Sequence, residues 1–149
     1  MMTETLKPII GWREWCSLPD LNIPAIKAKI DTGAKTSCLH AYDMEKYDNK
    51  GMNFVRFKVH PLQKDETLEV ECTAAIHDYR YVTSSNGVRE KRFVIITPLI
   101  LGSLKQDVEV TLSSRHEMQF RMLLGRDALS RFNVIVDTTK SFKFSKKIK

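Results

Sequence analysis

A short segment in the first third of the chain combines the side chains that acid–base chemistry requires. An apolar stretch, residues 25–30, leads directly into Asp31, Thr32, Gly33 and Ala34. The end of a strand would hold the Asp31 carboxylate rigidly, the Thr32 hydroxyl could form a hydrogen bond across a site, and Gly33 has no Cβ atom to keep a second backbone or a substrate away. We therefore predict that Asp31 is catalytic and that the three residues after it form the active-site loop. The alternative is an ordinary turn, because this tripeptide is common.

A second segment combines an apolar strand pattern with a helix pattern. The apolar run at residues 122–124 is followed by Gly125 and Arg126. From residue 126 to residue 132 the apolar side chains fall on one face of a helix. Alone, this segment is compatible with a plain strand–helix junction. Its position downstream of Asp31, in a chain rich in strand patterns, favours a functional pairing of the two segments.

Most of the remaining chain shows the patterns of β-strands. Alternating apolar and polar residues predict strands with one buried face at residues 26–30, 55–59, 68–74 and 108–112. Continuous apolar runs predict strands buried on both faces at residues 93–96, 99–101, 122–124 and 134–136. Helix patterns are limited to residues 126–132 and, weakly, 41–47. Many short strands at close spacing indicate an all-β barrel or sandwich.

Five segments together resemble a bacterial family of retropepsin-like aspartic peptidases, the RimB-like peptidases, which is often labelled "ATP-dependent zinc protease". These segments are residues 11–15, 26–37, 60–62, 84–87 and 120–126. The resemblance covers residues 9–139. It implies an all-β fold: a closed retropepsin-like (acid protease) barrel with one short C-terminal helix. It also implies that Leu124, Gly125 and Arg126 pass beneath the Asp31 loop and support it.

Hydrolysis of a peptide bond by carboxylates needs two of them a few ångströms apart. Two like charges this close cannot both ionise, so the pair shares one proton; one carboxylate takes a proton from water and the other donates to the carbonyl oxygen. The chain has one Asp-Thr-Gly. Two other aspartates are weaker candidates for the second carboxylate: Asp137 is followed by two threonines, and Asp127 is better suited as a charge at a helix N-terminus. We therefore expect a symmetric homodimer in which each protomer contributes Asp31.

A polar turn interrupts two strand patterns between residues 79 and 96. It consists of Ser84, Ser85, Asn86 and Gly87. We predict that the hairpin around this turn is a flap that covers the site and contacts the substrate. The alternative is a hairpin with no such role.

Several basic residues lie in or near these segments, and we take four of them as candidates for binding an acidic substrate: Lys35, Arg80, Arg89 and Arg92. The resemblance implies such a substrate, namely the oligoglutamate tails that a glutamate ligase adds to a ribosomal protein. Cations beside a cleft would attract it. Exposed arginines on a hairpin are also typical of ordinary protein surface.

The sequence has neither the zinc-binding motif nor the ATP-binding motif that the family's label would require. The chain has no His-Glu-x-x-His motif, and its histidines are scattered at positions 40, 60, 77 and 116. Residues 33–36 resemble the end of a phosphate-binding loop, but Ala34 stands where that loop needs a glycine. We expect no metal and no cofactor.

The basic charge of the chain is concentrated at one end. The 149 residues include 24 basic and 18 acidic ones, a formal net charge of +6, but residues 140–149 carry five lysines and no acid. Without those five, 19 basic residues face 18 acidic ones. We expect one peptidase domain at residues 1–139, then a Lys-rich strand or solvated tail at residues 140–149. We do not expect a nucleic-acid partner.

The cysteines and the hydropathy bear on location. Cys16, Cys38 and Cys72 stand far apart, which is typical of reduced thiols. No apolar run approaches the roughly 20 residues of a membrane span. We expect a cytoplasmic protein without membrane association. Two alternatives to a peptidase remain: an inactive retropepsin-like domain that binds acidic peptides, and a ribosome- or RNA-binding module that uses the basic tail.

Overall fold

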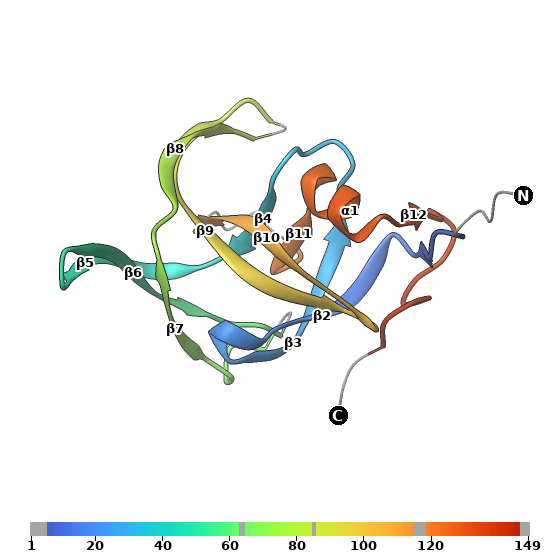
Figure 1. Ribbon diagram of the computed structural model, residues 1–149, viewed down its shortest axis with the longest axis horizontal. Coiled ribbons are helices and arrows are strands. Elements are labelled where there is room, and N and C mark those ends of the chain that lie inside the picture. Colours follow the sequence, from blue (N-terminus) through green and yellow to red (C-terminus); the bar gives the residue numbers. More distant parts are fainter. Residues whose placement is uncertain (1–5, 63–64, 85, 115–118, 147–149) are drawn as a thin grey trace, which may run out of the picture.

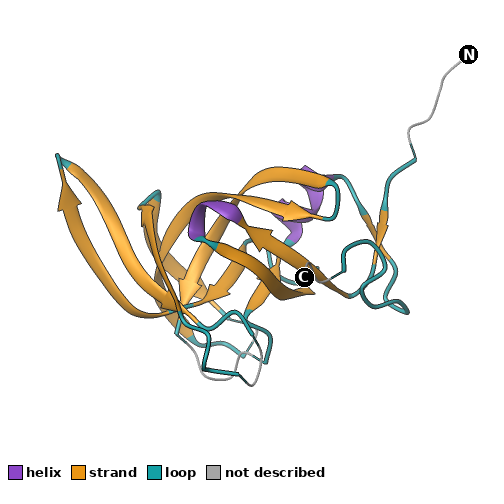
Figure 2. Cartoon of the chain, turned by 90° about the horizontal axis from the view of Figure 1, so that it is seen from below, coloured by secondary structure: helices purple, strands orange, loops and turns teal. Residues whose placement is uncertain are grey.

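Six strands form a closed barrel in this computed structural model, which describes residues 6–62, 65–84, 86–114 and 119–146 (Figure 1). The strand order around the barrel is β10, β4, β11, β3, β2 and β9, and β9 pairs with β10 to close it. These strands are β2 (Arg13–Leu18), β3 (Ile23–Ile30), β4 (Ser37–His40), β9 (Arg89–Leu101), β10 (Leu104–Ser113) and β11 (Met122–Leu124). The expected closed, all-β barrel is confirmed, and Figure 2 shows how strongly strands dominate.

Apolar residues of the alternating patterns fill the barrel interior. Ile26 of β3 and Val110 of β10 are both fully buried. Burial of a side chain of this size contributes about 1.5–3 kcal/mol. Cys16, Cys38 and Cys72 are buried thiols that form no disulfide in the described residues.

The apolar runs at residues 93–96 and 99–101 belong to one long strand, β9. Ile96 is 50% exposed and Ile135 is 51% exposed, so the prediction that these runs are buried on both faces is wrong at both residues. Ile96 lies on the outer face of a barrel strand, whereas residues 135–136 belong to a two-stranded sheet outside the barrel, so neither side chain is enclosed on both sides.

A separate antiparallel sheet extends from the barrel as an arm (Figure 1). It consists of β5 (Tyr42–Asn49), β6 (Met52–Val59) and β7 (Val70–Ala75). The helix predicted for residues 41–47 is wrong, because these residues form β5. A register shift between Tyr42 and Glu45 interrupts the alternation of β5, so its partly buried side chains lose the strict spacing of two and imitate a helical pattern.

The predicted hairpin is confirmed: β8 (Asp78–Thr83) pairs antiparallel with the first part of β9. Two backbone hydrogen bonds of 2.9 Å close its turn, from the Ser84 N–H to the Val88 carbonyl oxygen and from the Gly87 N–H to the Ser84 carbonyl oxygen. Gly87 has a φ of +84°, a conformation that favours glycine. The hairpin curves over one end of the barrel (Figure 1). Ser85 lies outside the described residues.

The helix predicted for residues 126–132 has the predicted bounds. Helix α1 (Arg126–Phe132) buries Ala128, Leu129 and Phe132. Beside it, β1 (Ile9–Ile10) pairs in parallel with β12 (Ile135–Val136). A short 3-10 helix, η1 (Pro19–Leu21), connects β2 to β3. None of the helices in the described residues is long and apolar enough to cross a membrane.

The described part of the Lys-rich segment, residues 140–146, is anchored to β2. The carboxylate of Glu14, which is fully buried, accepts backbone hydrogen bonds from Lys143 at 3.0 Å, Phe144 at 3.2 Å and Ser145 at 2.8 Å. Hydrogen bonds to an ionised acceptor are stronger than neutral ones. The boundary after residue 139, with a Lys-rich strand or tail beyond it, stays a prediction. These hydrogen bonds hold the backbone of residues 143–145 at Glu14.

Candidate active site

The Asp31 loop begins where β3 ends beside β11. The two strands are parallel, with Ile30 opposite Leu124. The Asp31 N–H donates a hydrogen bond of 2.8 Å to the Leu124 carbonyl oxygen. Inside the loop, the Gly33 N–H donates to Asp31 Oδ1 at 3.0 Å, and the Ala34 N–H donates to the Asp31 carbonyl oxygen at 3.3 Å. These bonds fix both the backbone and the carboxylate of Asp31.

Residues 125–127 hold the same loop from the other side. The Gly125 N–H donates to Ser37 Oγ at 3.1 Å, and the Arg126 N–H donates to the Ala34 carbonyl oxygen at 2.8 Å. The Arg126 guanidinium adds a hydrogen bond of 2.9 Å from Nη1 to the Thr32 carbonyl oxygen. The geometry agrees with the supporting position that the resemblance implies for this segment.

Gly125 meets this loop without room for a side chain. A Cβ atom at this position would lie 2.8 Å from the Thr36 carbonyl carbon and 2.9 Å from the Lys35 carbonyl oxygen. Both atoms belong to the backbone, so neither can move aside easily. The close approach of two backbones therefore explains why residue 125 is a glycine.

A cavity of about 360 Å³ opens above the loop. Asp31, Gly33, Ala34, Lys35 and Thr36 line one side, and Val82, Thr83 and Ser84 of the hairpin line another. The floor includes Cys38, Arg92, Thr111 and Leu123. The hairpin therefore lies where a flap over Asp31 would lie.

Arg92 is a buried cation in this cavity, with only 7% of its surface exposed. Its Nε donates to Glu90 Oε1 at 2.8 Å, and its Nη1 lies 3.3 Å from Thr111 Oγ1 and 3.5 Å from Cys38 Sγ. A charge this deeply buried needs partners, and Glu90 supplies one. Arg92 is also one of the residues that line the cavity containing Asp31.

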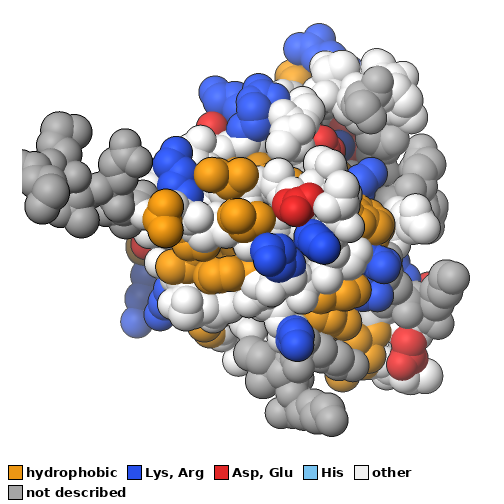
Figure 3. Space-filling model, turned by 90° about the vertical axis from the view of Figure 1, so that its right-hand side faces the viewer, with side chains coloured by type: hydrophobic (Ala, Val, Ile, Leu, Met, Phe, Trp, Pro, Cys, Tyr) orange, Lys and Arg blue, Asp and Glu red, His pale blue; other side chains and the backbone are white. Residues whose placement is uncertain are grey.

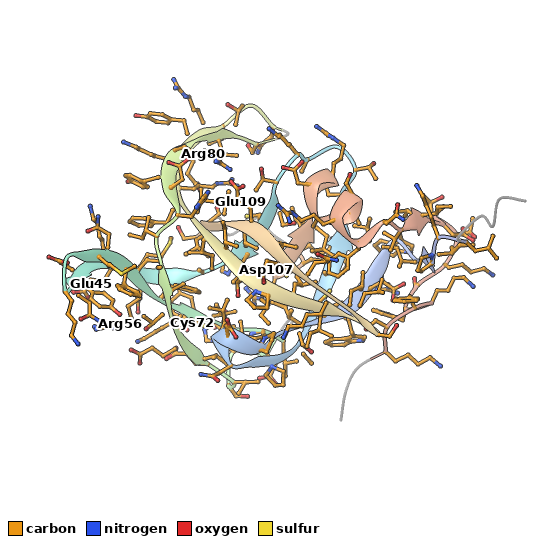
Figure 4. All side chains as sticks on the ribbon, viewed as in Figure 1. Glu45, Arg56, Cys72, Arg80, Asp107 and Glu109 are labelled. Carbon is orange, nitrogen blue, oxygen red and sulfur yellow. The ribbon has the colours of Figure 1, made fainter. Side chains whose placement is uncertain are left out.

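The four predicted acidic-substrate candidates separate into two groups. Lys35 and Arg92 line the Asp31 cavity, whereas Arg80 and Arg89 are not among its lining residues. Arg80 binds Asp78 at 3.1 Å and also binds Glu109. Figure 4 labels Arg80 on β8 and Glu109 on β10. Arg89 lies over the ring of Tyr81 on the outer face of the hairpin. Alternation along β9 puts Arg89 on the opposite face from Arg92. Arg80 pairs opposite Arg92 and shares its face, but two carboxylates bind it.

The two rival carboxylates occupy other places. Asp137 Oδ1 accepts hydrogen bonds from Thr139 Oγ1 at 2.6 Å and from the Thr139 N–H at 2.9 Å, and these hold the pKa of Asp137 below its ordinary value. The Asp137 N–H donates to the Ile10 carbonyl oxygen, beside the β1–β12 pair. Asp127 lies in the first turn of α1 and lines a different cavity, with Ile96. Neither lines the Asp31 cavity.

The described residues do not fit a zinc site. Among them, no three His, Cys, Asp or Glu side chains are grouped so that they could hold a metal ion. His40 belongs to β4, His60 follows β6 and His77 precedes β8, so the side chains do not share one element. His116 lies outside the described residues. We therefore assign no chemical step to a metal.

A closed barrel with one Asp-Thr-Gly loop, held by a strand, a glycine and a short helix, defines the retropepsin-like class. The family model described as "RimB-like: Retropepsin-like aspartic endopeptidase RimB" matches residues 9–147. The chain belongs to this family, which confirms the resemblance seen in the sequence.

Curated relatives carry a different name. A protein from Desulfotalea psychrophila is 49% identical over 129 residues, which cover 87% of this chain and 28% of the relative. A protein from Shewanella pealeana is 43% identical over 141 residues, which cover 95% of this chain and 31% of the relative. Both are called probable alpha-L-glutamate ligase. The chain thus spans less than a third of the length of these relatives.

A solved structure shares the fold. The crystal structure of a protein of unknown function from Legionella pneumophila matches with a TM-score of 0.76 and 29% sequence identity. The match covers 93% of this chain and 98% of the other. Nearly the whole chain therefore has a counterpart of known fold.

Proposed function

We propose that the protein is an aspartic peptidase that hydrolyses peptide bonds in an acidic substrate, and that two Asp31 carboxylates of a homodimer form its active site. The observation that carries this proposal is the position of Asp31. Its carboxylate lines a cavity beneath a hairpin, on a loop pinned by Leu124 and Arg126. A merely binding domain has no need for a carboxylate held in this way.

The paired carboxylates would share one proton, because two like charges at contact distance cannot both ionise. The ionised Asp31 accepts a proton from a water molecule as the water oxygen bonds to the carbonyl carbon of the substrate. The protonated Asp31 of the other protomer gives its proton to the carbonyl oxygen. The resulting diol then breaks its C–N bond, and a proton passes from the carboxyl groups to the departing nitrogen.

An apolar face beside Asp31 supports the dimer. Three aliphatic side chains there are exposed: Leu6 by 89%, Ile9 by 43% and Ile135 by 51%. A neighbouring groove of about 380 Å³ has a lining that includes Thr32, the residue directly after Asp31, together with Leu129 and Val134. Figure 3 shows apolar side chains gathered on this side of the molecule. A two-fold axis through this face would bring two Asp31 loops together.

Charge and relatives support an acidic substrate. Lys35 and Arg92 put two cations in the cavity of Asp31. The curated relatives, of which this chain matches less than a third, are named as glutamate ligases. A peptidase that removes glutamate chains would act on the product of such a ligase. We therefore propose oligoglutamate, or a glutamylated ribosomal protein, as the substrate, and a functional link to a glutamate ligase.

The test is hydrolysis of poly-L-glutamate, followed by mass spectrometry of the products, with and without EDTA. We expect that the wild type cleaves the polymer equally well with and without EDTA. The Asp31→Asn variant should be inactive, and the Asp137→Asn variant should remain active. Loss of activity with EDTA, or activity that survives Asp31→Asn, would contradict the proposal. Binding of poly-L-glutamate without any hydrolysis would identify an inactive peptide-binding domain instead.

A further inference from the structure

The outer face of the β8–β9 hairpin carries a row of aromatic and cationic side chains. Alternation along the two strands puts it on the opposite side from Val82 and Arg92, which line the Asp31 cavity. We call it the hairpin ladder and define it by five residues: Tyr79, Tyr81, Arg89, Lys91 and Phe93. Side chains on this side of β8 project away from the barrel (Figure 4).

The members of the ladder stack on one another. The ring of Phe93 lies 4.6 Å from the ring of Tyr79, with an interplanar angle of 23°. Lys91 Nζ lies between two rings, 4.6 Å from the centre of Tyr79 and 5.6 Å from that of Tyr81. The Arg89 guanidinium lies 4.0 Å from the ring centre of Tyr81. The row thus alternates ring and cation along the hairpin.

The ladder is exposed and its positive charge is not neutralised. Tyr79 is 48% exposed and Tyr81 is 57% exposed. Within the described residues, neither Arg89 nor Lys91 is within ion-pair distance of a carboxylate. The acidic residues of the hairpin, Asp78 and Glu90, are paired with Arg80 and Arg92 on the inner face.

A cation–aromatic pair on the arm provides a comparison for the hairpin ladder. On the arm, Arg56 lies 4.9 Å from the ring centre of Tyr47. There, however, Glu45 at 3.9 Å and Glu71 at 3.7 Å neutralise the guanidinium. The hairpin ladder differs from this arm pair because it repeats the ring–cation contact and because neither of its cations is neutralised by a carboxylate that the structure describes.

We propose that the hairpin ladder binds single-stranded nucleic acid. Same-face residues two apart on a strand are separated by about 6.5–7 Å, which is about twice the 3.4 Å rise between stacked bases. A base therefore fits between Tyr79 and Tyr81 once the flexible Lys91 side chain swings out to a phosphate. Exposed rings interleaved with cations are the features that bind such strands without reading their sequence. An acidic peptide would need the cations but not the rings.

This surface is separate from the Lys-rich segment on which our expectation about nucleic acid rested. The proposal also does not depend on peptidase activity, because none of the five ladder residues lines the Asp31 cavity. Failure of one proposal therefore leaves the other intact.

The experiment is fluorescence anisotropy with labelled 12-nucleotide oligouridine and oligodeoxythymidine, titrated with the full chain at several salt concentrations. We expect Tyr81→Ala to weaken binding about tenfold and Tyr81→Phe, which keeps the ring, to bind within about twofold of the wild type. Lys91→Gln should make the plot of the log association constant against log salt concentration less steep, by about 0.7. Arg56→Gln, the matched control on the arm, should bind as the wild type does. Binding of the ribose strand alone, or of both strands, identifies which nucleic acid is the partner.

Three results would overturn the proposal. One is no binding of either strand, and another is equal loss of binding in Arg56→Gln. The third is preferential binding of a labelled oligoglutamate, measured in the Asp31→Asn variant, that Tyr81→Ala and Lys91→Gln weaken. That result would assign the ladder to an acidic peptide. Thermal unfolding of each variant shows that the compared proteins are folded.

Discussion

The backbone N–H of Asp31 donates a hydrogen bond of 2.8 Å to the carbonyl oxygen of Leu124. This bond joins the end of β3 to the end of β11, where the two strands run in parallel. One residue further, Gly125 lies so close to Thr36 that a Cβ atom would come within 2.8 Å of its carbonyl carbon. The position of the Asp31 carboxylate therefore depends on the missing side chain at residue 125.

Gly125→Ala should destabilise the protein by about 1–3 kcal/mol, because the added methyl group overpacks a contact between two backbones. Urea unfolding measures this change. Gly33→Ala is the matched control, since its Cβ atom would meet only Asp31 Oδ1 at 3.3 Å. We expect the control to lose about 0.5 kcal/mol or less. Equal losses would show that residues 124–127 do not support the loop as described.

Glu14→Gln should also destabilise the fold, by about 1.5–3 kcal/mol, because the amide replaces a charged acceptor of buried N–H groups with a weaker one. Those groups belong to residues 143–145, so the variant should also expose this segment to a protease. Glu45→Gln, on the surface of the arm, should change stability by about 0.5 kcal/mol or less. An unchanged rate of proteolysis in Glu14→Gln would contradict the anchor.

Arg92→Gln should raise KM for oligoglutamate about tenfold or more, because a charged hydrogen-bond donor for the substrate is lost. The effect on kcat should be smaller, since Asp31 remains in place. Arg92→Lys keeps the charge, so its KM should lie between those of the wild type and Arg92→Gln. Lys105→Gln removes an exposed cation at the start of β10 and should leave KM unchanged. An unaltered KM in a folded Arg92→Gln variant would remove Arg92 from substrate binding.

The Asp137 carboxylate should make stability depend on pH in acid. The hydrogen bonds from Thr139 lower the pKa of Asp137 from 3.8, so the ionised form is favoured in the folded state. Its contribution is therefore complete above that value and is lost as the pH falls through the lowered pKa. The wild type should be more stable than Asp137→Asn at pH 6. This difference in urea midpoint should shrink below pH 3.8, and a difference that grows in acid would contradict the assignment.

Local patterns were sufficient to predict the part of the site that lies close together in the sequence. The strand before Asp31, the glycine at 125 and the helix after it all have short-range signals, and the structure has each of them. Strand alternation also separates Arg92 from Arg89, because the two are an odd number of residues apart on β9 and face opposite sides. The rule applies to Arg80, Arg89 and Arg92 on β8 and β9 but not to Lys35, which lies in a loop.

Long-range features were beyond such patterns. The bulge in β5 depends on pairing with β6, and without it the segment imitates a helix. Glu14 alternates with the buried Cys16, which is a signal for an inward-facing carboxylate, but its partners lie about 130 residues away. The anchoring of residues 140–146 therefore appears only once the barrel is closed.

Subunit mixing tests the central claim most directly, namely that one Asp31 from each of two chains forms a single site. Wild-type and Asp31→Asn chains are mixed in equal amounts, allowed to exchange subunits, and assayed on poly-L-glutamate. If both carboxylates are needed, only wild-type pairs are active, and activity falls to about one quarter of that of the same total amount of wild type. Activity of about one half, as independent subunits would give, would contradict the shared site.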